Sequence, residues 1–505
     1  MAERPLRVLF VFASLGGGGA EWQVRRLART LDPARYRLDA VVCRHLPGLP
    51  DQALARMSAT GVQVDTQPYG LSLEDTVAYL AGILPGYDCV VACEPTADLA
   101  PALEQLHLRP VSIDLQTLLA DEPTTVLDAA RRLPAAVPAL FGSFFQGGFE
   151  CSTHRRGHDR ARIDVIAATR HDALAASDYA ALQAHGLVTV RDGLRWHLIE
   201  RSPGVYDWSS LEHQLAGVAA TGTEVIWDLL HYGWPDDVDV WRPDFVARFA
   251  AFAEAAARTI AARLPGRHLY APVNEISFLS WGGGDAGYMN PFATARGFEL
   301  KVQLVRAAIA AMEAIRRVDP DARFVHADPV IHIATDPARP DDAAAAEGHR
   351  QAQFQAWDMI AGRCWPQLGG RADLLDIVGV NFYHNNQWVH GGAPIARGHP
   401  LYRAFHHMLA ETYARYGRPI FVAETGIEGE ARPEWLAHIC DEVALAIDLG
   451  VPVAGICLYP ILDHPGWDDD RDCPNGLLRT PPEGGTRLPF MPLARELAYQ
   501  RTRFS

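Results

Sequence analysis

The sequence predicts an α/β protein in two parts, a smaller Rossmann-like parallel-sheet domain followed by a (β/α)8 TIM barrel. Three observations support this prediction. Apolar strand runs alternate with helical patterns along the chain, which is typical of parallel sheets covered by helices. The length of 505 residues exceeds that of one ordinary domain. A content of 49% hydrophobic and 21% charged residues is that of a globular protein with a sizeable core.

The first domain is expected over residues 1–125. Its strands are expected at residues 8–13, 38–43, 62–64, 89–93 and 110–114. Four glycines, Gly16 to Gly19, separate the first strand from an amphipathic helix through Val24, Leu27 and Leu31. Bare N–H groups at such a helix start suit an anionic or hydroxyl-rich ligand. The glycines could equally serve only the turn, because their spacing is not G-x-G-x-x-G.

This segment resembles the N-terminal half of retaining glycosyltransferases of the GT-B fold over roughly residues 5–125. In that family a second Rossmann-like half holds most of the sugar nucleotide. No segment after residue 140 resembles such a half, so the resemblance does not favour glycosyl transfer by this chain alone.

A connector is expected at residues 126–142, which include Pro134 and Pro138 and many alanines. The barrel is expected over residues 143–505, longer than the about 250 residues typical of the fold and therefore with room for long loops. Its eight strands are expected at residues 143–149, 188–193, 224–230, 269–274, 324–327, 377–381, 420–424 and 454–459. Helices are expected between them, for example at residues 245–263, 294–317 and 434–449.

Two glutamates end predicted barrel strands. Asn274-Glu275 closes the fourth strand and Glu424-Thr425-Gly426 closes the seventh. Active sites of this fold lie at the carboxyl ends of the strands, and cleavage of a glycosidic bond needs a proton donor and a second carboxylate at the reacting carbon. Either motif alone is common by chance, since a strand-terminal glutamate often only caps the next helix. The pair in these two strands indicates a glycosidase.

With this pair the chain resembles glycoside hydrolase family 1, the β-glucosidase and β-galactosidase group, over residues 144–505. The resemblance implies that Glu275 is the acid/base and Glu424 the nucleophile of a retaining enzyme. It further implies that Arg191 and Tyr383 hold Glu424 in its ionised form, and that His231 and Asn274 bind sugar hydroxyls. Burial near Glu424 should favour the protonated form of Glu275. No metal or organic cofactor is required.

The sequence departs from the family at two strands. Glu150 lies near the place of a sugar-binding glutamine, and would accept hydrogen bonds from hydroxyls while changing which ring is tolerated. Tyr459-Pro460 replaces a tryptophan at the eighth strand, so Tyr459 or Trp467 could supply the apolar face for the sugar. The acidic loop 463–472 could hold calcium, although a solvated surface is the commoner explanation. Such acidity disfavours a sugar phosphate.

Composition limits the partners. The net charge of −15 opposes binding to nucleic acid. No run of about 18 apolar residues indicates a membrane span, and no signal peptide is evident, so we expect a cytoplasmic protein. Eight cysteines without paired spacing are expected to be reduced. The expected partner is a small-molecule or oligosaccharide glycoside. A non-catalytic carbohydrate-binding or regulatory protein and a transglycosidase remain alternatives to a hydrolase.

Overall fold

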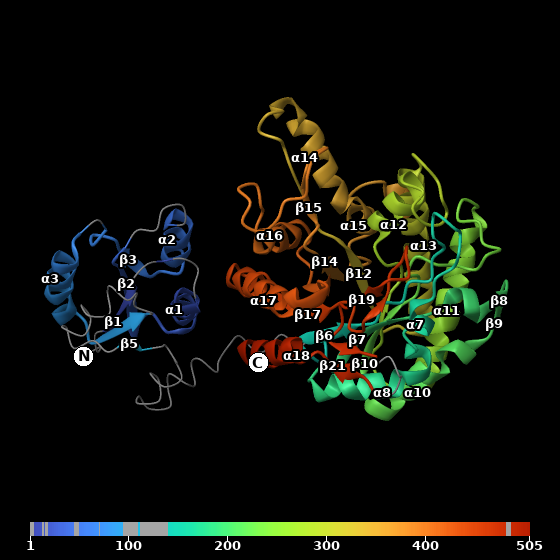
Figure 1. Ribbon diagram of the computed structural model, residues 1–505, viewed down its shortest axis with the longest axis horizontal. Coiled ribbons are helices and arrows are strands. Elements are labelled where there is room, and N and C mark those ends of the chain that lie inside the picture. The colour runs from blue at the N-terminus through green and yellow to red at the C-terminus, as the bar shows by residue number, and fades with distance from the viewer. Residues whose placement is uncertain are drawn as a thin grey trace. The chain divides into compact units, whose positions relative to one another are not determined.

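The computed structural model describes residues 5–12, 15, 19–44, 50–69, 71–93, 110–111, 140–480 and 486–504. The chain divides into two compact units, Met1–Pro138 and Ala139–Ser505, both drawn in Figure 1. The expected Gly16–18 turn and most of the expected connector lie outside the described residues. The predicted bounds of the three segments therefore stay a prediction: 1–125 for the first domain, 126–142 for the connector and 143–505 for the barrel.

The described residues of the N-terminal unit form a parallel sheet with the strand order β3-β2-β1-β4-β5, which is the Rossmann order 3-2-1-4-5-6 without its last strand. Its strands are β1 (Leu6–Phe12), β2 (Tyr36–Val42), β3 (Gln63–Asp65), β4 (Cys89–Cys93) and β5 (Pro110–Val111), and its helices are α1 (Gly19–Thr30), α2 (Pro50–Ser58) and α3 (Leu73–Ile83), the last followed by the short helix η1 (Leu84–Gly86). The predicted parallel sheet is confirmed.

Both faces of this sheet are buried. Phe10 and Phe12 pack with Val24 of α1, whereas Leu9 and Val11 pack with Leu80 of α3. Successive side chains of a strand point to opposite faces, which explains why β1 reads as an unbroken apolar run.

The C-terminal unit is a closed parallel barrel in the order β10-β11-β12-β14-β16-β17-β6-β7. Its strands are β6 (Phe145–Gly148), β7 (Thr189–Gly193), β10 (Glu224–Asp228), β11 (Leu269–Ala271), β12 (Arg323–Pro329), β14 (Ile377–Asn381), β16 (Ile420–Thr425) and β17 (Val453–Leu458). All eight predicted strands overlap these. The predicted (β/α)8 barrel is thus confirmed, and Figure 1 shows its helices around the strands.

Helices of two lengths surround the barrel. The longer ones are α8 (His171–Ala184), α10 (Glu212–Thr221), α11 (Asp244–Arg263), α13 (Gly297–Val318), α14 (Ala343–Gln351), α16 (Phe405–Tyr416), α17 (Arg432–Asp448) and α18 (Met491–Arg503). The shorter ones are α7 (Val165–Ala168), α9 (Trp196–Ile199), α12 (Ile276–Leu279), its continuation η3 (Ser280–Asp285) and α15 (Gln355–Ile360). Four strand pairs lie in the loops: β8 (Glu200–Ser202) with β9 (Val205–Tyr206), β13 (His332–Ala334) with β15 (Gln387–Val389), β18 (His464–Pro465) with β19 (Asp472–Cys473), and β20 (Leu478–Arg479) with β21 (Leu488–Pro489).

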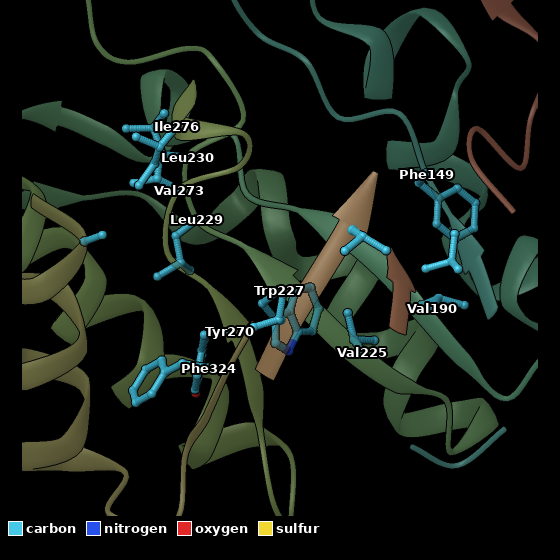
Figure 2. Packing of buried hydrophobic residues seen from close by; sticks show 14 of the residues in the cluster. Phe149, Val190, Val225, Trp227, Leu229, Leu230, Tyr270, Val273, Ile276 and Phe324 are labelled. Carbon is cyan, nitrogen blue, oxygen red and sulfur yellow. The ribbon is translucent and has the colours of Figure 1, made fainter. Parts of the chain in front are cut away.

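Alternation along the strands separates two cores. Val225 and Trp227 pack between the strands and the helices (Figure 2), whereas Ile226 packs inside the barrel. By the same alternation Val190 faces outward and Arg191 faces the barrel interior. The alternation along the strands thus directs side chains such as that of Arg191 into the barrel. Within the described residues, no helix combines the length and the apolar character needed to cross a membrane.

Candidate active site

A pocket of about 1170 Å³ opens where the barrel strands end. Its lining includes Glu150, His231, Glu275, Tyr383, Glu424 and Trp467. These are six of the nine residues predicted for the site, and a seventh, Arg191, lies behind the wall and donates a hydrogen bond to Glu424. The other two, Asn274 and Tyr459, contact His231.

Glu424 reaches the pocket through an irregularity of β16. Phe421 and Ala423 face the barrel interior and Val422 faces the helices, so regular alternation would turn Glu424 outward. The register of β16 with β17 shifts between Val422 and Thr425. Such shifts re-aim side chains near active sites, and here Glu424 lies in the pocket wall.

Two donors fix the carboxylate of Glu424. Its Oε1 accepts a hydrogen bond from Nη1 of Arg191 at 2.9 Å, and its Oε2 accepts one from the Tyr383 hydroxyl at 2.9 Å. Burial raises the pKa of Glu424, while the charge of Arg191 opposes that rise.

Glu275 follows β11 in the left-handed backbone region, with a φ of 45°. Its Oε1 accepts from Nδ2 of Asn381 at 2.8 Å, and its Oε2 accepts from the Tyr232 hydroxyl. Burial, and then the negative charge of Glu424, raise the pKa of Glu275 well above its usual range, whereas the two donors act in the opposite direction. The carboxyl group of Glu275 therefore favours its neutral form.

Arg191 is fully buried and joins several strands. Its Nη1 also donates to the carbonyl of Ala423 at 3.1 Å, and its Nη2 donates to Asp228 at 2.7 Å and to Oδ1 of Asn274 at 2.9 Å. A guanidinium presents a rigid fork of donors. Arg191 consequently sets the position of Glu424 relative to β10 and β11.

His231 and Glu150 face each other across the pocket wall. Nε2 of His231 lies 3.7 Å from Oε1 of Glu150, an oxygen that also accepts from the backbone N–H of Ser152 at 2.9 Å. The amide of Asn274 is used within the protein, since its Oδ1 accepts from Arg191 and its Nδ2 lies 3.2 Å from Nε2 of His231.

The two residues considered for the apolar face of the site differ in position. Trp467 lines the pocket, and its ring lies 5.5 Å from that of Tyr232. Tyr459 is buried beneath, with its ring parallel to His231 at 6.2 Å and its hydroxyl 3.4 Å from Nε2 of His231. A Cβ at Gly148 would approach Tyr459 to 2.1 Å, so a glycine is needed there.

Carboxylates of the acidic loop mostly have partners of the protein's own. Asp470 pairs with Arg156 at 2.7 Å, and Asp468 accepts from the Tyr288 hydroxyl at 2.8 Å. Arg471 within the loop makes two hydrogen bonds to Glu428, at 2.6 and 2.7 Å. Asp470 and Asp468 thus have partners within the protein.

Sequence reasoning missed Tyr232 and Asn381, which both donate to Glu275, and Asp228, which binds Arg191. Two of them could have been found from their position, because Asp228 and Asn381 are the last residues of strands β10 and β14, where side chains reach the pocket. Tyr232 has a φ of 68°, which no pattern in the sequence indicates.

One arm of the pocket contains Lys301 of α13, the single lysine of the sequence. Its ammonium group donates to Oε1 of Gln355 at 3.1 Å, and burial lowers its pKa. Nearby Asp328, at the end of β12, accepts from the hydroxyl of Ser277 at 2.7 Å. Burial raises the pKa of Asp328 to about 7.

Known proteins similar to this chain include a β-galactosidase and several β-glucosidases. Over 315 residues the chain is 24% identical to the β-galactosidase of Sulfolobus acidocaldarius; this match covers 51% of the chain and spans 62% of the length of that relative. The β-glucosidase of Thermotoga maritima, solved with glucoimidazole, is similar with a TM-score of 0.58 and 14% identity, over 72% of this chain and 98% of that one. The β-glycosidase of Thermosphaera aggregans is similar with a TM-score of 0.56 and 16% identity, over 66% of this chain and 85% of that one. At these identities the structures establish a likeness of fold. No family model matches the chain.

Proposed function

We propose that the barrel unit is a retaining glycoside hydrolase that cleaves β-linked glycosides, with Glu424 as nucleophile and Glu275 as acid/base. The observation that carries the proposal is the contrast between two buried carboxyl groups in one pocket. Glu424 is held by a guanidinium and a hydroxyl, whereas Glu275 has no cationic partner among the described residues. Paired carboxyl groups with opposite environments are what acid and nucleophile roles require. The glycosidase relatives support the same class.

In the first step, an oxygen of Glu424 attacks the anomeric carbon while neutral Glu275 gives its proton to the leaving oxygen. The alcohol departs and a covalent glycosyl ester remains on Glu424. In the second step, ionised Glu275 takes a proton from water, whose oxygen attacks the anomeric carbon and releases Glu424. Two inversions at one carbon retain its configuration.

The other residues of the pocket would bind and orient. Arg191 and Tyr383 hold Glu424 in line with the anomeric carbon. Glu150 and His231 would bind hydroxyls of the glycone, and Trp467 would offer an apolar face. Asn274 is proposed to contact the 2-hydroxyl, for which its amide would exchange a partner within the protein.

Two variants test the roles of the carboxylates on 2,4-dinitrophenyl β-glycosides, whose leaving group needs no proton. Glu424→Ala should lose nearly all turnover. Glu275→Ala should retain the first step, because general acid catalysis, worth about 10²–10⁴-fold, is dispensable there. Glu442→Gln, at a half-buried glutamate of α17 bound to His406, is the control and should keep activity.

Azide then separates the two roles, since a small anion fits the space left by either side chain. Glu424→Ala should give a glycosyl azide of inverted configuration, and Glu275→Ala one of retained configuration. Equal losses that azide does not rescue, or unchanged activity in either variant, would contradict the assignment of the two glutamates. A native protein that binds sugar without turnover would support the non-catalytic carbohydrate-binding alternative.

Transglycosylation uses the same residues but replaces water with a sugar acceptor. Product analysis with and without added acceptor distinguishes it: hydrolysis should yield free sugar in both conditions. New glycosides as the main product would assign the transferase activity instead.

A further inference from the structure

We propose that Cys151, Asp228 and His231 form a binding site for a divalent metal ion that accepts sulfur, such as Zn²⁺. Among the described residues they form a group whose ligand atoms lie close enough to share one ion. The site adjoins the proposed active site but does not depend on the proposed function, whose chemistry needs no metal.

The separations of the three ligand atoms fit one ion. Sγ of Cys151 lies 3.1 Å from Nδ1 of His231 and 3.7 Å from Oδ2 of Asp228, and these last two atoms are 3.1 Å apart. Zinc bonds are about 2.0 to 2.3 Å long in tetrahedral sites, which places neighbouring ligand atoms about 3.3 to 3.7 Å from one another. The three side chains need to shift by only a few tenths of an ångström.

The fold presets this arrangement. Asp228 ends β10, and His231 follows three residues later on the same loop. Cys151 enters from β6 and packs directly on β7, where a Cβ at Gly193 would lie 2.5 Å from Sγ. Glycine at this position gives the sulfur its room, and the three side chains are at least 97% buried.

An unpartnered oxygen points to a missing ligand. Oδ1 of Asp228 is buried without a hydrogen-bond partner, although Oδ2 of the same carboxylate has contacts to Arg191 and His231. A buried acceptor left unpaired costs about 1–3 kcal/mol. An ion bound through Oδ2 alone would leave Oδ1 unpaired, so the compensation requires that the carboxylate bind the ion through both oxygens.

Charge also balances when an ion is bound. Arg191 contacts Asp228 at 2.7 Å and would repel a cation added alone. Binding, however, removes the proton from the Cys151 thiol and transfers it to solvent. The thiolate and Asp228 then offset the two positive charges of the ion, Glu424 offsets Arg191, and the carboxylate of Glu150 beside His231 adds one further negative charge that favours a cation.

Metal binding would also fix the tautomer of His231. Nδ1 becomes the ligand, so the proton of the neutral ring resides on Nε2, where the Tyr459 hydroxyl and Glu150 offer acceptor oxygens, whereas Nδ2 of Asn274 is itself a donor and would lose its contact with the ring. His231 lines the pocket, which gives the ion its route of entry.

Cobalt titration of the chelator-treated, full-length protein under phosphine reduction tests the site. We expect one equivalent of Co²⁺ to bind, with visible bands of four-coordinate cobalt and a near-ultraviolet thiolate charge-transfer band. Cys151→Ser should abolish the charge-transfer band and weaken binding by at least about tenfold. Cys440→Ser, at a buried cysteine of α17 outside the group, should behave as the native protein.

A second measurement avoids any variant. The zinc-edge X-ray absorption of the native protein with one equivalent of Zn²⁺ should contain one sulfur at about 2.3 Å among nitrogen and oxygen ligands. A shell of oxygen and nitrogen alone, a charge-transfer band that persists in Cys151→Ser, or no binding at about 1 mM Co²⁺ would overturn the proposal. The group would then be a hydrogen-bonded cluster only.

Discussion

At the residue scale, Glu275, the proposed acid/base, depends on a neighbour in an uncommon backbone conformation. Tyr232 and Glu275 both have positive φ angles, 68° and 45°, and their side chains meet in a hydrogen bond. Non-glycine residues in this region cost of order 1–3 kcal/mol each and occur preferentially at functional sites. Nδ2 of Asn274 also donates to the Tyr232 hydroxyl at 3.1 Å, which leaves the tyrosine proton for Glu275.

Tyr232→Phe should therefore change the acidity of Glu275. The lost hydrogen bond stabilised the ionised form, so the pKa of Glu275 should rise further, and the alkaline limb of the kcat/KM profile should move upward by about one pH unit. Tyr270→Phe is the control, because Tyr270 donates to Asp319 at 3.1 Å outside the pocket. A stability loss like that of the control, with an unmoved limb, would reduce Tyr232 to a structural role.

At the scale of elements, the strands were predictable because each barrel strand is a short run buried on both sides. The run 377–381 was predicted with the bounds that β14 has, and the other seven differ by a few residues at their ends. The direction of the Glu424 side chain was not predictable from the alternation of residues, since it depends on the register shift of β16. The contact of Cys151 with Asp228 joins residues 77 positions apart, and no local pattern indicates it.

Helix α8 is tied to β7 by a buried ionic cluster. His171 lies 2.8 Å from Asp178 and 2.9 Å from Asp192, and Arg487 donates to Asp178 at 2.8 Å. Burial alone would lower the pKa of His171, but the charge of Asp192 and the contacts with Asp178 raise it to about 9. The folded protein thus holds a proton that the unfolded chain releases near pH 6.5.

This cluster predicts a loss of stability in alkali. A raised folded-state pKa gives stabilisation that is complete below pH 6.5 and disappears as the pH rises through about 9. The free energy of unfolding in urea should fall by roughly 3 kcal/mol over that window, and His171→Gln should flatten the fall. His326→Gln is the control. Burial lowers the pKa of His326 to about 4, so the titration of this histidine changes the free energy of unfolding only below about pH 6.5. A slope unchanged in His171→Gln would contradict the assignment.

At the scale of the whole molecule, each unit has hydrophobic clusters of its own. Phe10 and Leu9 pack within the first unit, whereas Trp227 and Ile226 pack within the barrel unit. The resemblance of the first unit to a glycosyltransferase half stays a prediction.

Residues 140–505 expressed alone should fold and turn over β-glycosides with a kcat/KM within about twofold of the full chain, because the pocket is built from this unit. Thermal unfolding and activity, each measured beside the full-length protein, check the expectation. An insoluble or inactive barrel would show that the two units fold as one and would remove the proposed boundary.

Lys301 provides the pocket with an amine that can be labelled chemically. It is the single lysine of the sequence, and it lies in the pocket wall with a lowered pKa. Apart from the amino terminus, an amine-directed reagent therefore has one side chain to label. Reductive methylation with ¹³C-formaldehyde would install one spectroscopic reporter in the pocket beside that of the amino terminus, and its NMR signal should change when a ligand enters that arm of the pocket.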